Sequence, residues 1–98
     1  MSKAILALGS NLGNPKENLD RAVAALACVG TVEEVAPYIL SKPEGYAPQA
    51  DFVNTVLILE TALEPMPLLR ALKQLEKDLG RTPTVPNGPR VIDLYILF

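Results

Sequence analysis

Hydrophobic positions in the first third of the chain change from strand-like to helix-like spacing. Residues 3–8 form a short apolar run that ends at Gly9, which is typical of a buried strand. Segment 9–14, rich in glycine and asparagine, predicts a loop. Asn14-Pro15 then predicts a helix start, because asparagine suits the cap and proline suits the first helical position. Apolar side chains recur at helical spacing to about Val29, where we expect this helix to end.

The remainder of the chain predicts two strands, a second helix and a final strand. Residues 31–40 are strand-like, but Pro37 indicates an edge strand or a bulge. Segment 41–50 predicts a loop, whereas residues 52–60 predict a strong strand. Glu64-Pro65 opens a second helix with a stripe of leucines, and Gly80 ends it. After the polar loop 81–89, residues 91–98 are rich in β-branched, aromatic and aliphatic side chains and predict the last strand.

The order of elements, β-α-β-β-α-β, predicts an α+β fold of the ferredoxin-like type. In this arrangement both helices cover one face of a four-stranded antiparallel sheet, and right-handed crossovers leave few alternatives. We expect a single domain over residues 1–98. The other face of the sheet stays open, and strand alternation places on it Phe52, Asn54, Val56, Val91, Asp93, Tyr95 and Leu97.

The last predicted strand contains one residue that does not fit a strand interior. Its even-numbered residues are all apolar and are predicted to face the core: Ile92, Leu94, Ile96 and Phe98. Aspartate is disfavoured in strands and is rarely buried without a partner, which makes Asp93 unusual. Arg90 precedes it by three residues, directly after a Gly-Pro turn. A guanidinium and a carboxylate at one strand end suit a polyphosphate with its metal ion, and an Arg90–Asp93 ion pair at the sheet edge is the alternative.

Composition narrows the classes of partner and the setting. The 98-residue chain has a net charge of −2, which argues against a nucleic-acid binder with a broad basic surface but allows a small anionic ligand. Because the chain has no histidine, His-based catalysis and His metal ligation within it are excluded. The first apolar run is too short for a signal sequence or a membrane span. Cys28 is the single cysteine, so we expect no disulfide within the chain and a reducing, cytoplasmic setting.

Four motifs occur in an order that resembles a known enzyme family. They are Ala7-Leu8-Gly9-Ser10-Asn11-Leu12-Gly13, Asp51-Phe52-Val53-Asn54, Leu75-Glu76 with Leu79-Gly80-Arg81, and Gly88-Pro89-Arg90-Val91-Ile92-Asp93-Leu94. Together they resemble 6-hydroxymethyl-7,8-dihydropterin pyrophosphokinase, which transfers pyrophosphate from ATP to a pterin alcohol in folate biosynthesis. The resemblance spans essentially the whole chain and implies a ferredoxin-like core, in agreement with the pattern above.

The resemblance implies which residues bind the phosphates of ATP. In the family, the arginine of the Gly-Pro-Arg motif contacts the phosphates, and two aspartates of the following strand hold two magnesium ions. Arg90 and Asp93 match the arginine and the first aspartate. Glu76 and Arg81 match residues near the nucleotide and its phosphates. We therefore expect Asp93, Arg90 and Arg81 to be catalytic, with Asp93 as the ligand of Mg²⁺ and ATP as the co-substrate.

The resemblance also implies where the pterin binds. The asparagine of the family's middle strand binds the pterin ring edge, and Asn54 matches it. Phe52 keeps the family's aromatic ring without the usual tyrosine hydroxyl. The alternative for Asn54 is a polar residue that faces water from an open sheet. Gly9 and Ser10 lack the Walker spacing, and we expect them to form a strand-to-helix turn that shapes the floor of the pocket.

Three features depart from the family pattern. Tyr95 stands where the second aspartate is expected, and a neutral phenol is a poor magnesium ligand. Residues 82–87 lack the arginines and the tryptophan that the family usually has there. The chain ends at Phe98, before the usual C-terminal continuation, which supplies further nucleotide contacts and an aromatic that sandwiches the pterin.

These departures leave two hypotheses for the function. One is a pyrophosphokinase with weak turnover. The other is a non-catalytic descendant that binds a pterin or a nucleotide and dimerises. In either case we expect small-molecule ligands, without nucleic acid or membrane. A homodimer is expected through the apolar residues of the open face, namely Phe52, Val56, Ile58, Val91, Tyr95 and Leu97.

Overall fold

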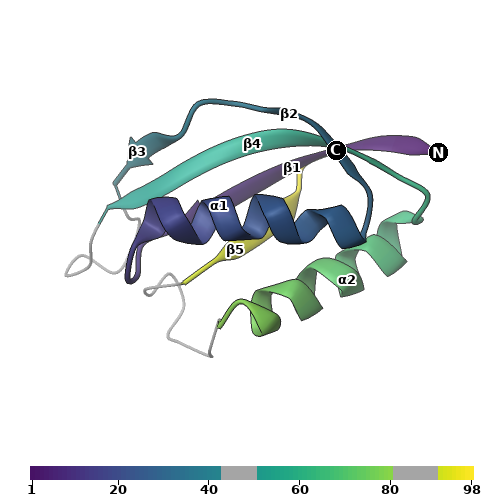
Figure 1. The fold of residues 1–98 in the computed structure, drawn as a ribbon. Helices are drawn as coiled ribbons and strands as arrows, with labels where there is room; N and C mark the ends of the chain where they lie inside the picture. The colour runs from purple at the N-terminus through teal and green to yellow at the C-terminus, as the bar shows by residue number, and fades with distance from the viewer. Residues whose placement is uncertain (43–50, 81–90) are drawn as a thin grey trace.

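The sheet of the computed structural model is antiparallel, and both α-helices lie on one of its faces (Figure 1). The structure describes residues 1–42, 51–80 and 91–98. Within them the elements are β1 (Ser2–Ser10), α1 (Pro15–Ala25), the 3₁₀ turn η1 (Leu26–Cys28), β2 (Thr31–Val35), β3 (Ile39–Ser41), β4 (Phe52–Thr61), α2 (Pro65–Asp78) and β5 (Asp93–Ile96). The strand order is β2-β4-β1-β5, with β3 also paired to β4. This arrangement confirms the predicted ferredoxin-like α+β fold.

The strand predicted at 31–40 is divided into β2 and β3. Both pieces pair with β4, so together they occupy the place of one edge strand. Pro37 lies between them, and proline cannot donate a ladder hydrogen bond. The connection stays attached to β4, because the Ala36 N–H donates to the Val56 carbonyl at 2.9 Å. Thr55 Oγ1 also donates to the Ala36 carbonyl at 2.7 Å, so the interruption is fixed in place.

Both helices begin where the sequence predicts. The side chain of Asn14 caps α1 by accepting the Glu17 N–H at 3.2 Å. The helix predicted to reach about Val29 is α-helical only to Ala25, and the turn η1 follows it directly. After α2, Gly80 has a φ of 102°, the left-handed conformation that commonly ends a helix.

The hydrophobic core lies between the sheet and the two helices. In β1, Leu6 and Leu8 are buried on the helix side, whereas Ile5 and Ala7 belong to the other face. The buried apolar residues are Ala4, Leu6, Leu8, Leu19, Ala22, Leu26, Leu57, Leu59, Leu68, Leu72, Leu75, Ile92 and Leu94. The helices therefore cover one face of the sheet and leave the other face for a binding site.

Two predictions about strand ends are wrong. The sequence predicts a loop from Gly9, but β1 continues to Ser10 because β4 and β5 both extend along it. Phe98 is predicted in the core, but β5 ends at Ile96 and the Phe98 side chain is 86% exposed. The predicted loops fall largely on segments 43–50 and 81–90, which lie outside the described residues.

Candidate functional site

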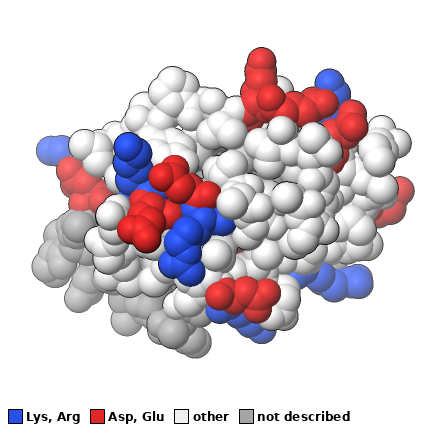
Figure 2. All heavy atoms as spheres, viewed as in Figure 1, with Lys and Arg blue, Asp and Glu red and all other residues white. Residues whose placement is uncertain are grey.

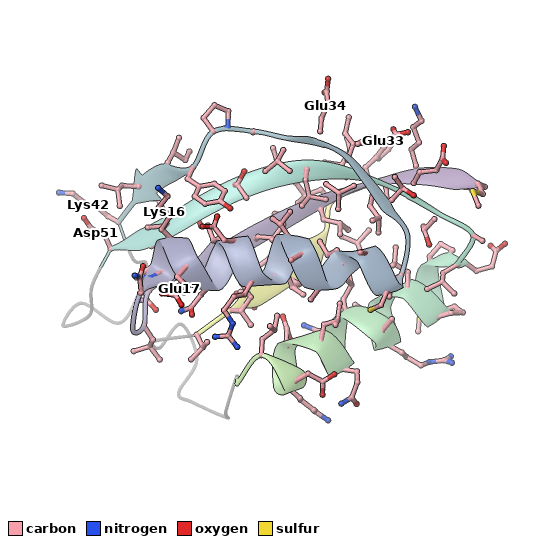
Figure 3. All side chains as sticks on the ribbon, in the orientation of Figure 1. Lys16, Glu17, Glu33, Glu34, Lys42 and Asp51 are labelled. Carbon is pink, nitrogen blue, oxygen red and sulfur yellow. The ribbon has the colours of Figure 1, made fainter. Side chains whose placement is uncertain are left out.

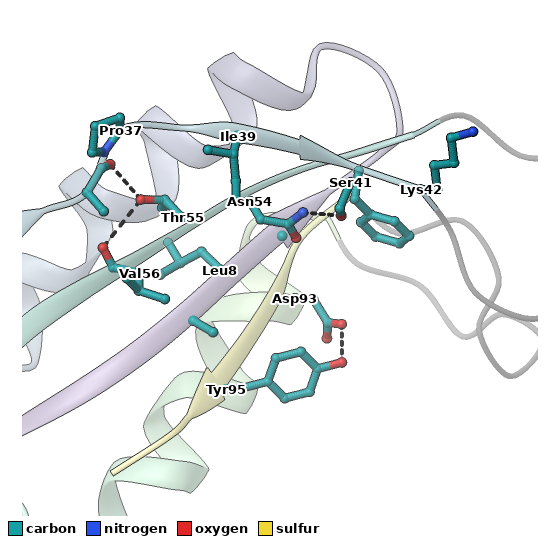
Figure 4. Close-up of a pocket in the computed structure, with 14 residues that line it drawn as sticks. Leu8, Pro37, Ile39, Ser41, Lys42, Asn54, Thr55, Val56, Asp93 and Tyr95 are labelled. Atoms are coloured by element: carbon teal, nitrogen blue, oxygen red, sulfur yellow. Dashed lines mark hydrogen bonds between the residues drawn. The ribbon is translucent and has the colours of Figure 1, made fainter.

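A pocket of about 700 Å³ opens on the face of the sheet that the helices do not cover (Figure 4). Its lining comes from β1, β3, β4, β5 and the connection between β2 and β3. The polar residues that line it are Ser41, Lys42, Asn54, Thr55, Asp93 and Tyr95. Small-molecule sites commonly enclose about 300–1,000 Å³ and combine an apolar lining with a few polar groups. The pocket therefore has the size and the composition of a site for a small organic ligand.

Small residues on the central strand form the floor of this pocket. The strand register places Gly9 between Asn54 of β4 and Asp93 of β5. Ala7, two residues earlier on β1, likewise lies between two larger residues, Val56 of β4 and Tyr95 of β5. A Cβ atom on Gly9 would lie 2.8 Å from Asn54 Oδ1, which is too close for carbon and oxygen. Glycine is therefore required here as long as the asparagine amide keeps its position.

One side of the pocket, the amide side, consists of Ser41, Phe52 and Asn54. Asn54 Nδ2 donates a hydrogen bond to Ser41 Oγ (Figure 4). Ser41 pairs with Phe52 across β3 and β4, so the aromatic ring and the amide line the same region. An amide offers both donors and an acceptor, and an aromatic ring suits the surface of a flat ligand. The amide side can therefore contact a planar heterocycle along its edge and on its surface.

The opposite side of the pocket, the carboxylate side, consists of Asp93 and Tyr95. The two residues share the pocket face of β5, and the Tyr95 hydroxyl donates a hydrogen bond to Asp93 Oδ2 (Figure 4). Asp93 is only 2% exposed. Lys73 Nζ lies 5.9 Å from the centroid of the Tyr95 ring, within cation–π range. The carboxylate predicted to bind a metal ion thus lines the pocket with a phenol as its neighbour.

Glu76 lies away from the pocket, between α2 and β5. It is 3% exposed, and its Oε2 accepts the Leu94 N–H at 2.7 Å. Lys73 Nζ lies 3.4 Å from its Oε1. Leu97 N donates to Ile5 O of β1 at 2.8 Å, and by strand alternation the Leu94 N–H points away from β1. Glu76 therefore accepts a hydrogen bond from a backbone N–H on the outer edge of β5. Its predicted role at the nucleotide remains a prediction.

Of the other predicted site residues that the structure describes, one lines the pocket and one does not. Gly9 lines the pocket floor, as expected. Ser10 is fully buried, and its Oγ accepts a hydrogen bond from Asn18 Nδ2 at 3.1 Å, so it packs beneath the floor without lining the pocket. Arg81 and Arg90 lie outside the described residues. The structure thus brings Gly9, Phe52, Asn54 and Asp93 together.

Three of the polar residues that line the pocket were not predicted from the sequence: Ser41, Lys42 and Thr55. Ser41 holds the Asn54 amide, and Lys42 brings a positive charge to the rim. Figure 3 shows Lys42 and Asp51 at the same end of the molecule as Lys16 and Glu17 of α1. A hydroxyl and a cation directly before a proline-containing loop are the only sequence signal, and it is weak because such residues are common at strand ends.

Tyr38 fixes the wall of the pocket that carries Pro37. Its hydroxyl donates to Asp20 Oδ1 at 2.6 Å, which ties the connection between β2 and β3 to α1. Burial, together with the hydrogen bond to Asp20 and the negative charge of Asp20, raises the pKa of Tyr38 to about 12. The phenol therefore keeps its proton, and this link, at all physiological pH values.

The described residues do not form a complete metal site, and their surface charges are mixed. Figure 2 shows acidic and basic side chains intermingled on the side that α1 covers. Among the described residues, no three His, Cys, Asp or Glu side chains are grouped to hold a metal ion. A metal ion at Asp93 would therefore need oxygen ligands from a substrate, from water or from elsewhere in the protein. No helix in the described part of the chain is long and apolar enough to cross a membrane.

Comparisons with known proteins agree on one family. The family model of 7,8-dihydro-6-hydroxymethylpterin-pyrophosphokinase (HPPK) matches residues 5–98. A protein of Bacillus subtilis named 2-amino-4-hydroxy-6-hydroxymethyldihydropteridine pyrophosphokinase is 44% identical over 97 residues, which is 96% of this chain and 58% of the relative. The Pseudomonas aeruginosa protein of the same name is 40% identical over 99% of this chain and 61% of its own length. The chain thus spans about three fifths of these relatives.

Proposed function

Because the chain belongs to the 7,8-dihydro-6-hydroxymethylpterin-pyrophosphokinase family, we propose that it transfers pyrophosphate from ATP to 6-hydroxymethyl-7,8-dihydropterin in folate biosynthesis. One observation carries this proposal. Residues from two motifs that are far apart in the sequence, Phe52 and Asn54 of one and Asp93 of the other, line one pocket on the open face of the sheet. An amide and an aromatic ring on one side and a carboxylate on the other suit a substrate with a flat heterocycle and a reacting hydroxymethyl group.

The amide side is the proposed pterin site. A pterin ring presents alternating donors and acceptors at its edge, which a fixed carboxamide can match. Ser41 and Gly9 hold Asn54 in one orientation, so little ordering is needed when the ligand binds. Phe52 supplies an apolar surface for the ring. These contacts would orient the hydroxymethyl group toward the phosphates of ATP, which is most of what such a transfer requires from protein.

The carboxylate side is the proposed phosphate site. Asp93 fits one Mg²⁺, because this ion binds proteins through one or two carboxylates and takes its other ligands from phosphates and water. When bound, the ion would neutralise charge on the phosphate oxygens. We propose that Asp93 orients the metal–nucleotide and that Arg81 and Arg90 grip the phosphates. Glu76 would act from beneath, by holding β5 in position.

The test is the reaction itself. The protein is incubated with Mg²⁺, ATP and 6-hydroxymethyl-7,8-dihydropterin, and AMP is measured by chromatography. AMP that appears only when all three are present supports the proposal. Asn54→Ala serves as the matched control, because it removes the amide and keeps the carboxylate side. Binding of both substrates without any AMP would contradict the proposed turnover.

Tyr95 favours a second candidate function, a non-catalytic pterin- or nucleotide-binding descendant. The residue places a neutral phenol against the only described carboxylate that lines the pocket. Such a protein would bind the pterin in a calorimeter, with or without a non-hydrolysable ATP analogue, and form no AMP. An absence of pterin binding in both conditions would remove this candidate.

We also propose a homodimer through the open face of the sheet. Apolar or aromatic side chains on this face are partly exposed on β1, β4, β5 and the residue after β5: Ile5, Val56, Tyr95 and Leu97. Exposed apolar clusters commonly mark interfaces, and a two-fold axis would pair the same patch on both copies. Sedimentation at micromolar concentration should give the mass of a dimer, and a monomer there would contradict this proposal.

We further propose that residues 1–98 act as one domain in a reducing, cytoplasmic setting. Cys28 is free and exposed, which suits a compartment that keeps thiols reduced. A purified protein that unfolds in one cooperative transition would support the single domain. Two separate unfolding transitions would contradict the single domain.

A further inference from the structure

The geometry of β5 leads us to propose that the pocket holds one divalent cation beside the nucleotide, and that Tyr95 sets this number. The inference rests on the proposed function, because the cation is expected to arrive with ATP. It concerns the residues of this chain, where a phenol occupies the second pocket-facing position of β5.

Asp93 and Tyr95 are two residues apart on β5, and both line the pocket. Residues i and i+2 of a strand point to the same face, about 6.5–7 Å apart along the chain. Carboxylates at both positions could flank two ions, which in two-metal sites lie about 3.5–4 Å apart. In this chain one of the two positions is a neutral phenol, so the strand offers a single anionic ligand.

A hydrogen bond joins Tyr95 to Asp93. The Tyr95 hydroxyl donates to Asp93 Oδ2, so the phenol acts as a donor toward the carboxylate and its oxygen is directed at Asp93. Carboxylates that bind metal ions are commonly oriented by such donors from neighbouring residues. Tyr95 therefore has the geometry of a positioning residue for one cation at Asp93 and not that of a ligand for another cation.

Lys73 and Asp93 both carry a charge close to Tyr95. Lys73 Nζ lies 5.9 Å from the centroid of its ring and 3.4 Å from Glu76 Oε1, so an ammonium group stands beside the phenol. Asp93 is the only acidic residue among the described pocket-lining residues. A second dication would thus meet a phenol and an ammonium group where it needs a carboxylate.

The experiment counts bound cations. Mn²⁺ is titrated into the protein at saturating non-hydrolysable ATP analogue, and free Mn²⁺ is measured by electron paramagnetic resonance. The wild type should bind one Mn²⁺ per protein–nucleotide complex, whereas Tyr95→Asp should bind two. Tyr95→Phe is the matched control, because it keeps the ring, removes the hydroxyl and adds no charge, and it should bind one.

Each outcome decides a different point. Two Mn²⁺ ions in the wild type would overturn this inference and leave the proposed function intact. A single ion in Tyr95→Asp would overturn the role of residue 95, and two ions in Tyr95→Phe would overturn the need for a carboxylate. If Tyr95→Asp does not fold by circular dichroism, the wild-type and Tyr95→Phe counts still decide the number. Failure of the wild type to bind the nucleotide at any Mn²⁺ concentration would overturn the proposed function and this inference with it.

Discussion

The amide side and the carboxylate side of the pocket face each other across β1, yet they differ in what holds their polar groups. On the amide side, Asn54 is positioned by a hydroxyl from β3 and by a glycine on β1, so three strands fix one carboxamide. On the carboxylate side, Asp93 and Tyr95 belong to one strand and bond to each other. The proposed pterin site and the proposed metal site therefore depend largely on different strands, and we expect that one can change in sequence while the other stays as it is.

Replacing the charge at Asp93 should give the largest effect. Asp93→Asn keeps the shape of the side chain and removes the anion that would bind Mg²⁺. Magnesium-dependent affinity for the ATP analogue should disappear, and any AMP formation should fall roughly a thousandfold. Calorimetry with the pterin alone provides the control, because the amide side is untouched and pterin affinity should be unchanged. AMP formation at the wild-type rate would show that Asp93 does not bind the catalytic metal ion.

Removing the amide of Asn54 should have the next largest effect, on the opposite side. Asn54→Ala should weaken pterin binding by about 1–3 kcal/mol, which is roughly fivefold to more than a hundredfold. Binding of the ATP analogue with Mg²⁺ should be unaffected, which distinguishes this variant from Asp93→Asn. Equal losses of pterin and nucleotide affinity would mean that the two sides do not act independently.

Loss of the Ser41 hydroxyl should have a smaller effect of the same kind. Ser41→Ala removes the acceptor that orients the Asn54 amide, at a cost of about 1 kcal/mol, or roughly fivefold in pterin affinity. Ser41→Thr keeps the hydroxyl and should restore most of the affinity, as calorimetry can show. A deficit in Ser41→Thr as large as that in Ser41→Ala would argue that Ser41 acts through packing.

The smallest expected effect concerns the pocket wall at alkaline pH. The folded protein raises the pKa of Tyr38 to about 12, whereas an unfolded tyrosine titrates near about 10. Between these values the unfolded chain binds fewer protons, so the stability that the protonated phenol contributes is complete below about pH 10 and is lost as pH rises toward 12. Tyr38→Phe should show a smaller fall in melting temperature over this range than the wild type. Identical slopes in the two proteins would contradict the link to Asp20.

Much of the fold follows from the sequence because local patterns and pairing agree there. The helix start at Asn14 and the alternation in β4 appear as expected, whereas the single strand expected over residues 31–40 is divided at Pro37. The ends of the strands do not follow from the sequence, because the pairing partners determine them. Gly9 lies in β1 because it pairs with Asn54 and Asp93, although glycine disfavours strands.

The site was predictable where a strand face decided it. Asn54 and Asp93 meet in one pocket because alternation assigns both to the open face. Glu76 was harder to place, since its partner is a backbone N–H of β5 and no side-chain pattern indicates that bond. The contact between Ser41 and Asn54 joins residues on two different strands, so its geometry appears only once the register is known.

The floor made by Gly9 and Ala7 has a consequence for how this site can change over time. The cavity exists because side-chain atoms are missing on β1, and the larger residues around it lie on separate strands. Substitutions at the rim alter the chemistry of the pocket without filling it, whereas a methyl group added at Gly9 would displace the Asn54 amide. The site can therefore lose or regain an activity through single rim substitutions while it still admits a ligand of the same size.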